Sequence, residues 1–247
     1  MSLRRVILIE DFAAVSGGAT MIAHETALAH AGAGLEVIYL AGGPALSPAL
    51  EAAGVVVKGV GNANLLQRPA LQALRLGLHD AGAAQAISGW LQEYLIPGSI
   101  VHVHGYLQTL SPSVFGALAP ASGRIVLHAH DFFYVCPTGA YFNFQTGEKC
   151  ALTPMSGACI KDHCDKRSRL QKFWRVERMR RVQKGVKALG SPPVVVLHEG
   201  MAPILERGGI ERARIHVHRN PVTPWCDDRV RAEDTQGVLY VGRRGED

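Results

Sequence analysis

The sequence predicts an α/β protein with a doubly wound, mostly parallel, Rossmann-like sheet. Short continuous apolar runs recur along the chain, beginning with Val-Ile-Leu-Ile at residues 6–9. Such runs are typical of strands that are buried on both faces, as in parallel sheets. Helix-length segments separate the runs and glycine-rich turns mark the junctions, which is the pattern of repeated strand–helix–strand units.

Seven strands and the helices between them follow from this pattern. The strands are expected at residues 6–9, 35–40, 55–60, 99–104, 124–127, 194–197 and 215–218. The helices are expected at residues 19–31, 48–53, 64–95 with a break near 77–82, 112–118, 166–189 and 199–206. The helix at 166–189 has apolar residues at spacings of three and four, which indicates one buried face and one solvated basic face. The buried face would consist of Leu170, Phe173, Trp174, Met179, Val182, Val186 and Leu189.

The composition is typical of a soluble globular protein, since 47% of the 247 residues are hydrophobic and 19% are charged. The longest apolar runs are strand-sized, well short of the roughly 20 residues of a membrane-spanning helix. The first apolar run meets an acid at Glu10, which does not fit a signal peptide. Five cysteines without an export signal favour reduced thiols, so we expect a cytoplasmic protein.

The charge distribution indicates an anionic partner. The formal net charge is +5, and residues 166–187 hold ten Lys or Arg against the single acid Glu177. This basic helix could contact acidic lipid at the inner face of a membrane, a phosphate-bearing acceptor, or only solvent. Nucleic acid is not expected as a partner, because aromatic residues are not interleaved with the basic ones as a stacking platform requires.

Polar residues concentrate at two strand ends. The strand at 124–127 runs into His128-Ala-His130-Asp131, and the carboxyl ends of parallel strands are where α/β proteins bind ligands. The first strand leads to Ser16-Gly17-Gly18 before a helix. Glycine there lets backbone N–H groups approach an anion, although most such turns only satisfy backbone geometry. The dinucleotide-binding pattern G-x-G-x-x-G is absent from this turn.

Four cysteines fall in a loop at residues 136–164. Cys136, Cys150, Cys159 and Cys164 could supply four thiolates to a structural zinc ion, which would stabilise an otherwise long loop. Their spacings are not the CxxC pairs of familiar zinc folds. Free buried thiols are therefore a second interpretation, and a disulfide is a third.

Three His-x-His pairs occur at strand ends, at residues 102 and 104, 128 and 130, and 216 and 218. Residues i and i+2 of a strand face the same way, so such pairs could bind the metal of a hydrolase. Acidic ligands are scarce at these ends, where only Asp131, Glu10 and Asp11 qualify. We therefore expect buried, hydrogen-bonded, neutral imidazoles and no catalytic metal.

Four segments follow one another in a recognisable order. They are Ser16-Gly17-Gly18-Ala19, Val101-His-Val-His104-Gly105, His130-Asp-Phe-Phe-Tyr-Val-Cys-Pro137 and Gly209-Ile-Glu-Arg-Ala-Arg-Ile-His-Val-His-Arg-Asn-Pro-Val222, followed by a strand-like segment at 237–247. Taken together they resemble the N-terminal half of the family-4 retaining glycosyltransferases. That family has the GT-B architecture, in which two Rossmann-like domains face each other across a cleft. Where the family usually has Ser opening the helix after the sixth strand, this chain has His198.

The resemblance implies roles for individual residues. His130 would be the catalytic residue beside the transferred sugar, and Gly17, Gly18 and Arg243 would lie on the donor phosphates, with His104 and Asp131 on the acceptor side. The implied reaction transfers a hexose from a nucleotide-sugar to a glycan, lipid-linked or other acceptor with retention. Positioning and electrostatics would dominate it, with no catalytic metal.

The resemblance also divides the chain. Residues 1–222 would form the acceptor-side domain, residues 223–236 an interdomain linker, and residues 237–247 the first strand of a truncated donor-binding domain. Because the family's nucleotide-binding lysine and glutamates would lie beyond residue 247, the chain alone is expected to be inactive. The alternatives from other classes are a non-enzymatic zinc-stabilised binding domain and a metal-dependent hydrolase built on the His-x-His pairs.

Overall fold

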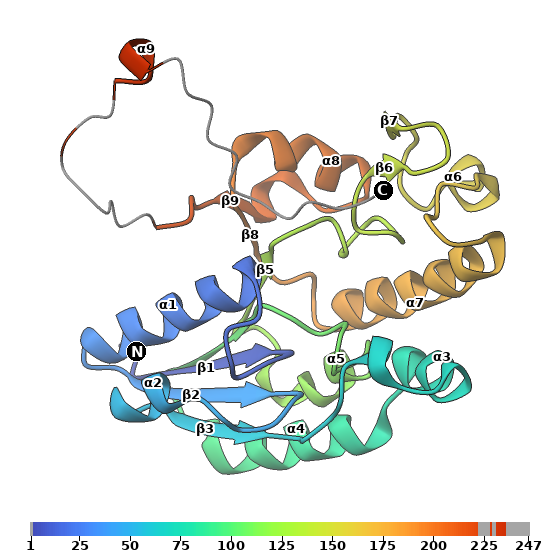
Figure 1. Ribbon diagram of the computed structural model, residues 1–247. Helices are drawn as coiled ribbons and strands as arrows, with labels where there is room; N and C mark the ends of the chain where they lie inside the picture. Colours follow the sequence, from blue (N-terminus) through green and yellow to red (C-terminus); the bar gives the residue numbers. More distant parts are fainter. Residues whose placement is uncertain (1, 222–227, 229–230, 236–247) are drawn as a thin grey trace.

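The centre of the molecule is a sheet of seven parallel strands (Figure 1). The computed structural model describes residues 2–221, 228 and 231–235. The strand order is β3-β2-β1-β4-β5-β8-β9, with β1 (Arg5–Glu10), β2 (Glu36–Ala41), β3 (Val56–Gly59), β4 (Ser99–Val103), β5 (Ile125–Ala129), β8 (Val194–Val196) and β9 (Ile215–Val217). The order reverses between β1 and β4, which is the topological switch point of a doubly wound sheet. The predicted Rossmann-like fold class is confirmed.

Helices cover both faces of the sheet. On one face, α1 (Gly18–Gly32) and α2 (Pro48–Ala52) share a core with β1, β2 and the start of β3. On the other face, α4 (Ala81–Tyr94), α5 (Val114–Ala117), α7 (Arg169–Ala188) and α8 (Ala202–Arg207) share a larger core with β1, β4, β5 and β8. We call these the α1 face and the α4 face of the sheet.

Shorter elements complete the described structure. They are η1 (Leu65–Gln67), α3 (Ala70–Leu78), η2 (Ala119–Ala121), β6 (Phe142–Asn143), β7 (Glu148–Lys149), α6 (Gly157–Lys161), η3 (Glu199–Met201), η4 (Arg212–Arg214) and α9 (Ala232–Thr235). β6 and β7 form an antiparallel pair within the cysteine loop, and α3 packs against α7. No helix in the described ranges is long and apolar enough to cross a bilayer.

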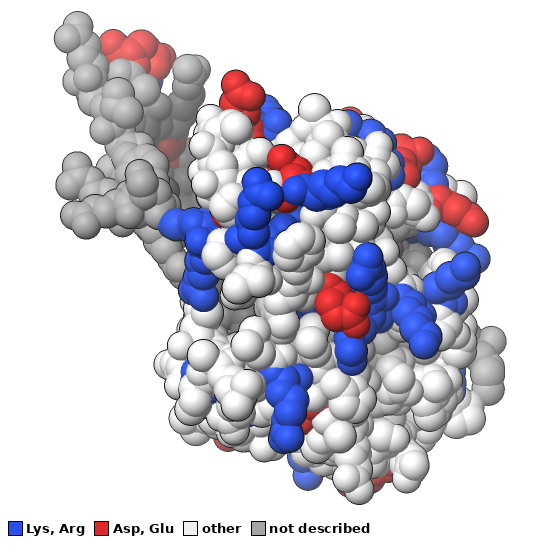
Figure 2. All heavy atoms as spheres, turned by 90° about the vertical axis from the view of Figure 1, so that its right-hand side faces the viewer, with Lys and Arg blue, Asp and Glu red and all other residues white. Residues whose placement is uncertain are grey.

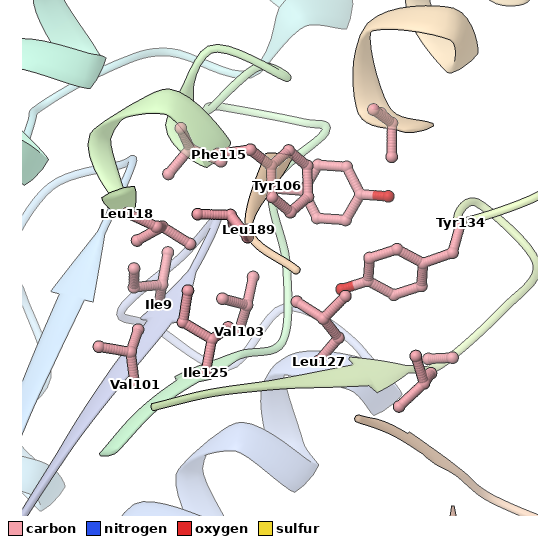
Figure 3. Packing of buried hydrophobic residues seen from close by; sticks show 14 of the residues in the cluster. Ile9, Val101, Val103, Tyr106, Phe115, Leu118, Ile125, Leu127, Tyr134 and Leu189 are labelled. Atoms are coloured by element: carbon pink, nitrogen blue, oxygen red, sulfur yellow. The ribbon is translucent and has the colours of Figure 1, made fainter. Parts of the chain in front are cut away.

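Alternation along the strands decides which residues enter each core. Ile9 of β1, Val103 of β4 and Leu127 of β5 point to the α4 face, where they share a core with Phe115, Leu118 and Tyr134 (Figure 3). The intervening residues of β4 and β5 face the α1 side. The pleat therefore turns the histidines of both strands to the α1 face.

The expected helical stretch at 64–95 is broken where the sequence predicts a break. α3 ends at Leu78, and Asp80 begins α4 by accepting a hydrogen bond from the N–H of Ala83 at 2.9 Å. The Asp80 N–H is bonded in turn to the hydroxyl of Ser111 at 3.0 Å. Asp80 is thus a buried N-cap whose backbone is bonded to the segment after β4, and it separates the two helices.

The predicted division of α7 into an apolar buried face and a basic wet face is partly wrong. Leu170 and Phe173 are 81% and 52% exposed, whereas Lys172 and Arg178 are buried. The Lys172 amine lies among cysteine thiols, and the Arg178 guanidinium donates to the carbonyl of Leu107. Both basic groups are buried because they have polar partners there, which the spacing of apolar residues does not reveal.

Candidate functional site at the switch point

Asp11, directly after β1, anchors the loop that follows β4. Its carboxylate accepts hydrogen bonds from the backbone N–H groups of Leu107, Thr109 and Leu110 at 2.8 to 2.9 Å. The hydroxyl of Thr109 donates to the backbone carbonyl of Asp11 at 2.5 Å, with the carboxylate 3.1 Å away. With its oxygens engaged in this way, Asp11 is a structural anchor of the switch point rather than a free metal ligand.

Glu10 is a buried carboxyl at the same place. The residue is 3% exposed, and its Oε2 atom has no hydrogen-bond partner among the described residues. Burial, with the nearby charge of Asp11 as a smaller cause, raises the pKa of Glu10 well above its usual value. Gly105 leaves room for it, because a Cβ at that position would lie 2.5 Å from the Glu10 Oε1 atom.

His104 and His130 meet across the ends of β4 and β5. The Nδ1 atom of His104 lies 3.1 Å from the Nε2 atom of His130, so one imidazole donates to the other. Asp131 follows His130. Its carboxylate accepts a hydrogen bond from the N–H of Phe133 at 2.8 Å, at the start of the loop that follows β5. The structure thus brings His104 and His130 together, with Asp131 as the next residue.

The histidines of β4 and β5 favour the neutral form. Burial lowers the pKa of His130 to about 4. Burial followed by the charges of neighbouring histidines lowers the pKa of His102 to about 3 and that of His128 to about 2, and it also lowers the pKa of His104. At neutral pH each ring therefore offers one unprotonated nitrogen.

The turn at Gly17 and Gly18 is open. A Cβ built on either glycine would meet nothing within 4 Å, and Gly17 has the extended backbone that any residue adopts. No side chain caps α1, and no acid lies in its first turn. The N–H groups and positive dipole end of a 15-residue helix are thus free to receive an anion.

The four cysteines of the loop at 136–164 are free thiols, and two of them lie beside a buried lysine. The Lys172 amine donates to the Sγ atom of Cys164 at 2.9 Å and lies 3.9 Å from the Sγ atom of Cys159. Cys136 is also buried, while Cys150 is half-buried. A zinc ion bound by the four thiolates would have to displace this amine, so the structural zinc stays a prediction.

The remaining predicted residues separate. His216 on β9 and His218 just after it are exposed, unlike the other two His-x-His pairs. Arg243, most of the predicted linker at 223–236 and the segment at 237–247 lie outside the described residues. The sequence reasoning missed two features, the buried Lys172 and the convergence of His102 and His128. The convergence of the two histidines depends on the register of β4 against β5, in which His102 lies opposite Val126.

Comparisons with known proteins add little. No family model matches the chain, and no curated protein is significantly similar to it. Among solved structures, the binary complex of leucoanthocyanidin reductase with NADPH from Vitis vinifera matches at a TM-score of 0.35 and 16% sequence identity. The match covers 78% of this chain and 49% of the reductase. A similarity of this size carries no argument about function, and the fold and site define the molecule only as a Rossmann-like α/β protein with a polar switch point.

Proposed function

We propose that residues 1–222 form the acceptor-side domain of a retaining glycosyltransferase that uses a nucleotide-sugar. The observation that carries the proposal is the open Gly17-Gly18 turn at the start of α1, on the sheet edge where His104 and His130 meet. Neither glycine is required by the backbone or by packing in the free chain. Space held open at a helix N-terminus suits a phosphate group.

The chemistry of such a transfer fits the groups that are present. The backbone N–H groups at the start of α1 would stabilise negative charge on the departing nucleotide diphosphate. His130, held by His104, would position the sugar as a neutral hydrogen-bonding group, since burial keeps its pKa near 4. The acceptor hydroxyl would then attack from the face that the leaving group vacates.

A second surface supports a lipid-linked or membrane-bound acceptor. Apolar side chains of η1 and α3 line two neighbouring grooves beside Trp174 of α7, whose indole N–H donates to the carbonyl of Leu74 at 2.9 Å. Figure 2, viewed from the side of these helices, shows many more Lys and Arg than Asp and Glu side chains. The lipid-facing patch, as we name it, consists of Leu66, Leu71, Leu74, Leu170 and Phe173 with Arg68, Arg75, Arg167 and Arg169 at its rim.

Such a patch fits the surface of an anionic membrane. Leu71 of α3 and Leu170 of α7 are 82% and 81% exposed, and the two helices pack against each other. Apolar side chains inserted at the lipid boundary and Arg side chains at the head groups are what peripheral membrane binding requires. The prediction of membrane contact through residues 166–187 is thereby extended to α3.

Binding of sugar nucleotides to the full chain tests the donor side of the proposal. Saturation-transfer NMR detects weak ligands, so UDP-hexose, GDP-hexose and NADPH can be compared on one sample. We expect the protein to pass saturation to one of the sugar nucleotides, which shows binding. The double variant Gly17→Ala, Gly18→Ala should lose this binding, because two methyl groups fill the open turn. The melting temperature should stay close to that of the wild type.

Gly89→Ala is the matched control. Gly89 lies in α4, and a Cβ there also meets nothing within 4 Å. This variant should keep full ligand binding and gain a little stability, about 0.5–1 kcal/mol. NADPH binding with no response to any sugar nucleotide would refute the proposed function and assign the open turn to another phosphate ligand.

A further inference from the structure

Three histidines form a compact cluster on the α1 face of the sheet. His102 and His104 come from β4 and its end, and His128 comes from β5. Their ring centroids are 4.2 Å, 4.7 Å and 5.3 Å apart. One ring nitrogen from each residue lies within 4.8 Å of the other two, the only group of metal-ligating atoms this close in the described part of the chain.

Four ring nitrogens of this cluster have no hydrogen-bond partner among the described residues. They are the Nε2 atoms of His102 and His104 and both ring nitrogens of His128, and all of them are buried. Leaving a buried polar atom unpaired costs about 1–3 kcal/mol. Several unpaired atoms that lie close together indicate a shared ligand, and the lone pairs of neutral imidazoles can bind a metal cation.

We propose that His102, His104 and His128 form a binding site for a divalent metal ion of the zinc class. Three imidazole ligands suit Zn²⁺, and a coordination position would remain open for water or another ligand. Tetrahedral sites with zinc–nitrogen distances of about 2.1 Å place their ligand atoms about 3.4 Å apart. Metal binding would therefore require side-chain rotations that bring the three nitrogens from within 4.8 Å to this spacing.

Two neighbours complete the site. His130 contacts the Nδ1 atom of His104 at 3.1 Å, which leaves the His104 Nε2 atom for the metal and orients the ring, as outer-shell partners of metal-bound histidines do. Glu10, at the end of the neighbouring strand β1, also faces the α1 side, and its buried Oε2 atom has no hydrogen-bond partner among the described residues. The site does not depend on the proposed transfer reaction.

Cobalt and zinc titration of the reduced, chelator-treated full chain tests the proposal. We expect one high-affinity Co²⁺ per chain, with d–d absorption bands and no thiolate-to-cobalt charge-transfer band, and displacement by Zn²⁺. A charge-transfer band at the first equivalent would assign the metal to the cysteines and overturn the proposal. Absence of binding would overturn it as well.

Variants locate the ion. His128→Leu should weaken Zn²⁺ binding by at least about 100-fold, because outer-shell changes alone cost about 10–100-fold. His130→Ala should weaken it by about 10-fold. His216→Leu, which changes an exposed histidine of β9, is the matched control and should leave binding unchanged. Equal affinity in His128→Leu and the wild type would place the ion elsewhere and refute the site.

A second readout does not require the variant to fold. X-ray absorption at the zinc edge of the wild-type chain with one Zn²⁺ should show nitrogen and oxygen ligands, with the scattering pattern of imidazole. Sulfur in the first coordination shell would contradict the proposal even if His128→Leu could not be purified.

Discussion

Lys172 is an unexpected residue of the interior, because a primary amine is rarely buried without a carboxylate. Its hydrogen bond goes to a thiol, 2.9 Å away at Cys164, and it is 2% exposed. Burial raises the pKa of Cys164 and Cys159, and the amine acts against that rise in both thiols. One side chain thus sets how readily two cysteines ionise.

Lys172→Met tests this relation. Without the amine, the pKa values of Cys159 and Cys164 should rise further, so the thiolate absorbance should appear at higher pH in a titration. The free energy of unfolding should change little or increase, because Met fills a similar volume and neutral thiols behave as small apolar groups. Lys184→Met, an exposed change on the same helix, is the control and should leave the thiol titration where it is. An unfolded Lys172→Met chain would show that the fold requires the hydrogen bond between the amine and Cys164.

At the scale of elements, the lipid-facing patch is a surface that the spacing of apolar residues alone predicts to be buried. Leu170 and Phe173 continue the apolar stripe of α7, but nothing in the described structure covers them. The first turns of the helix project past the sheet toward α3 and the cysteine loop. An apolar surface bordered by arginines results where a buried face was expected.

Sedimentation with lipid vesicles measures this surface. We expect the chain to bind vesicles that contain anionic lipid, with binding that weakens as salt increases. Leu170→Glu with Phe173→Glu should abolish it, since the two carboxylates would face the head groups. Leu46→Glu changes another exposed leucine, outside the patch and 66% exposed, and should bind as the wild type does. Equal binding of both variants would rule out the patch as the contact.

Much of the architecture could be predicted from sequence, because buried strands and glycine turns are local signals. Strand ends such as His128-Ala-His130 were located correctly for the same reason. The histidine cluster could not be predicted, since it depends on the register between β4 and β5. The burial of Lys172 could not be predicted either. Its partners lie in the cysteine loop, and the sequence of that loop has no periodic pattern that indicates its conformation.

At the scale of the whole molecule, histidine burial makes stability depend on pH. Four imidazoles of the switch point have lowered pKa values, so below about pH 6.5 the unfolded chain binds protons that the folded chain does not. Each of these imidazoles lowers the free energy of unfolding by up to about 1.4 kcal/mol per pH unit as the pH falls. Glu10, with a raised pKa, acts in the opposite direction and offsets one of them.

Denaturant unfolding of the chelator-treated chain between about pH 7.5 and 5.5 checks this expectation. The free energy of unfolding should be highest near neutral pH and fall steeply below about 6.5. His128→Leu should reduce the slope by up to about 1.4 kcal/mol per pH unit, because one proton-binding difference is removed. His216→Leu should keep the wild-type slope. A flat profile would mean that the cluster protonates without unfolding.

The anchoring of the loop after β4 by Asp11 has a consequence for how ligands bind. Since one carboxylate holds Leu107, Thr109 and Leu110 to the end of β1, the two strand ends that border the switch point move as a single body. These two strand ends are already ordered before any ligand arrives, so little conformational entropy is lost on association. Ligands that contact them should therefore associate at similar rates and differ in how long they stay bound.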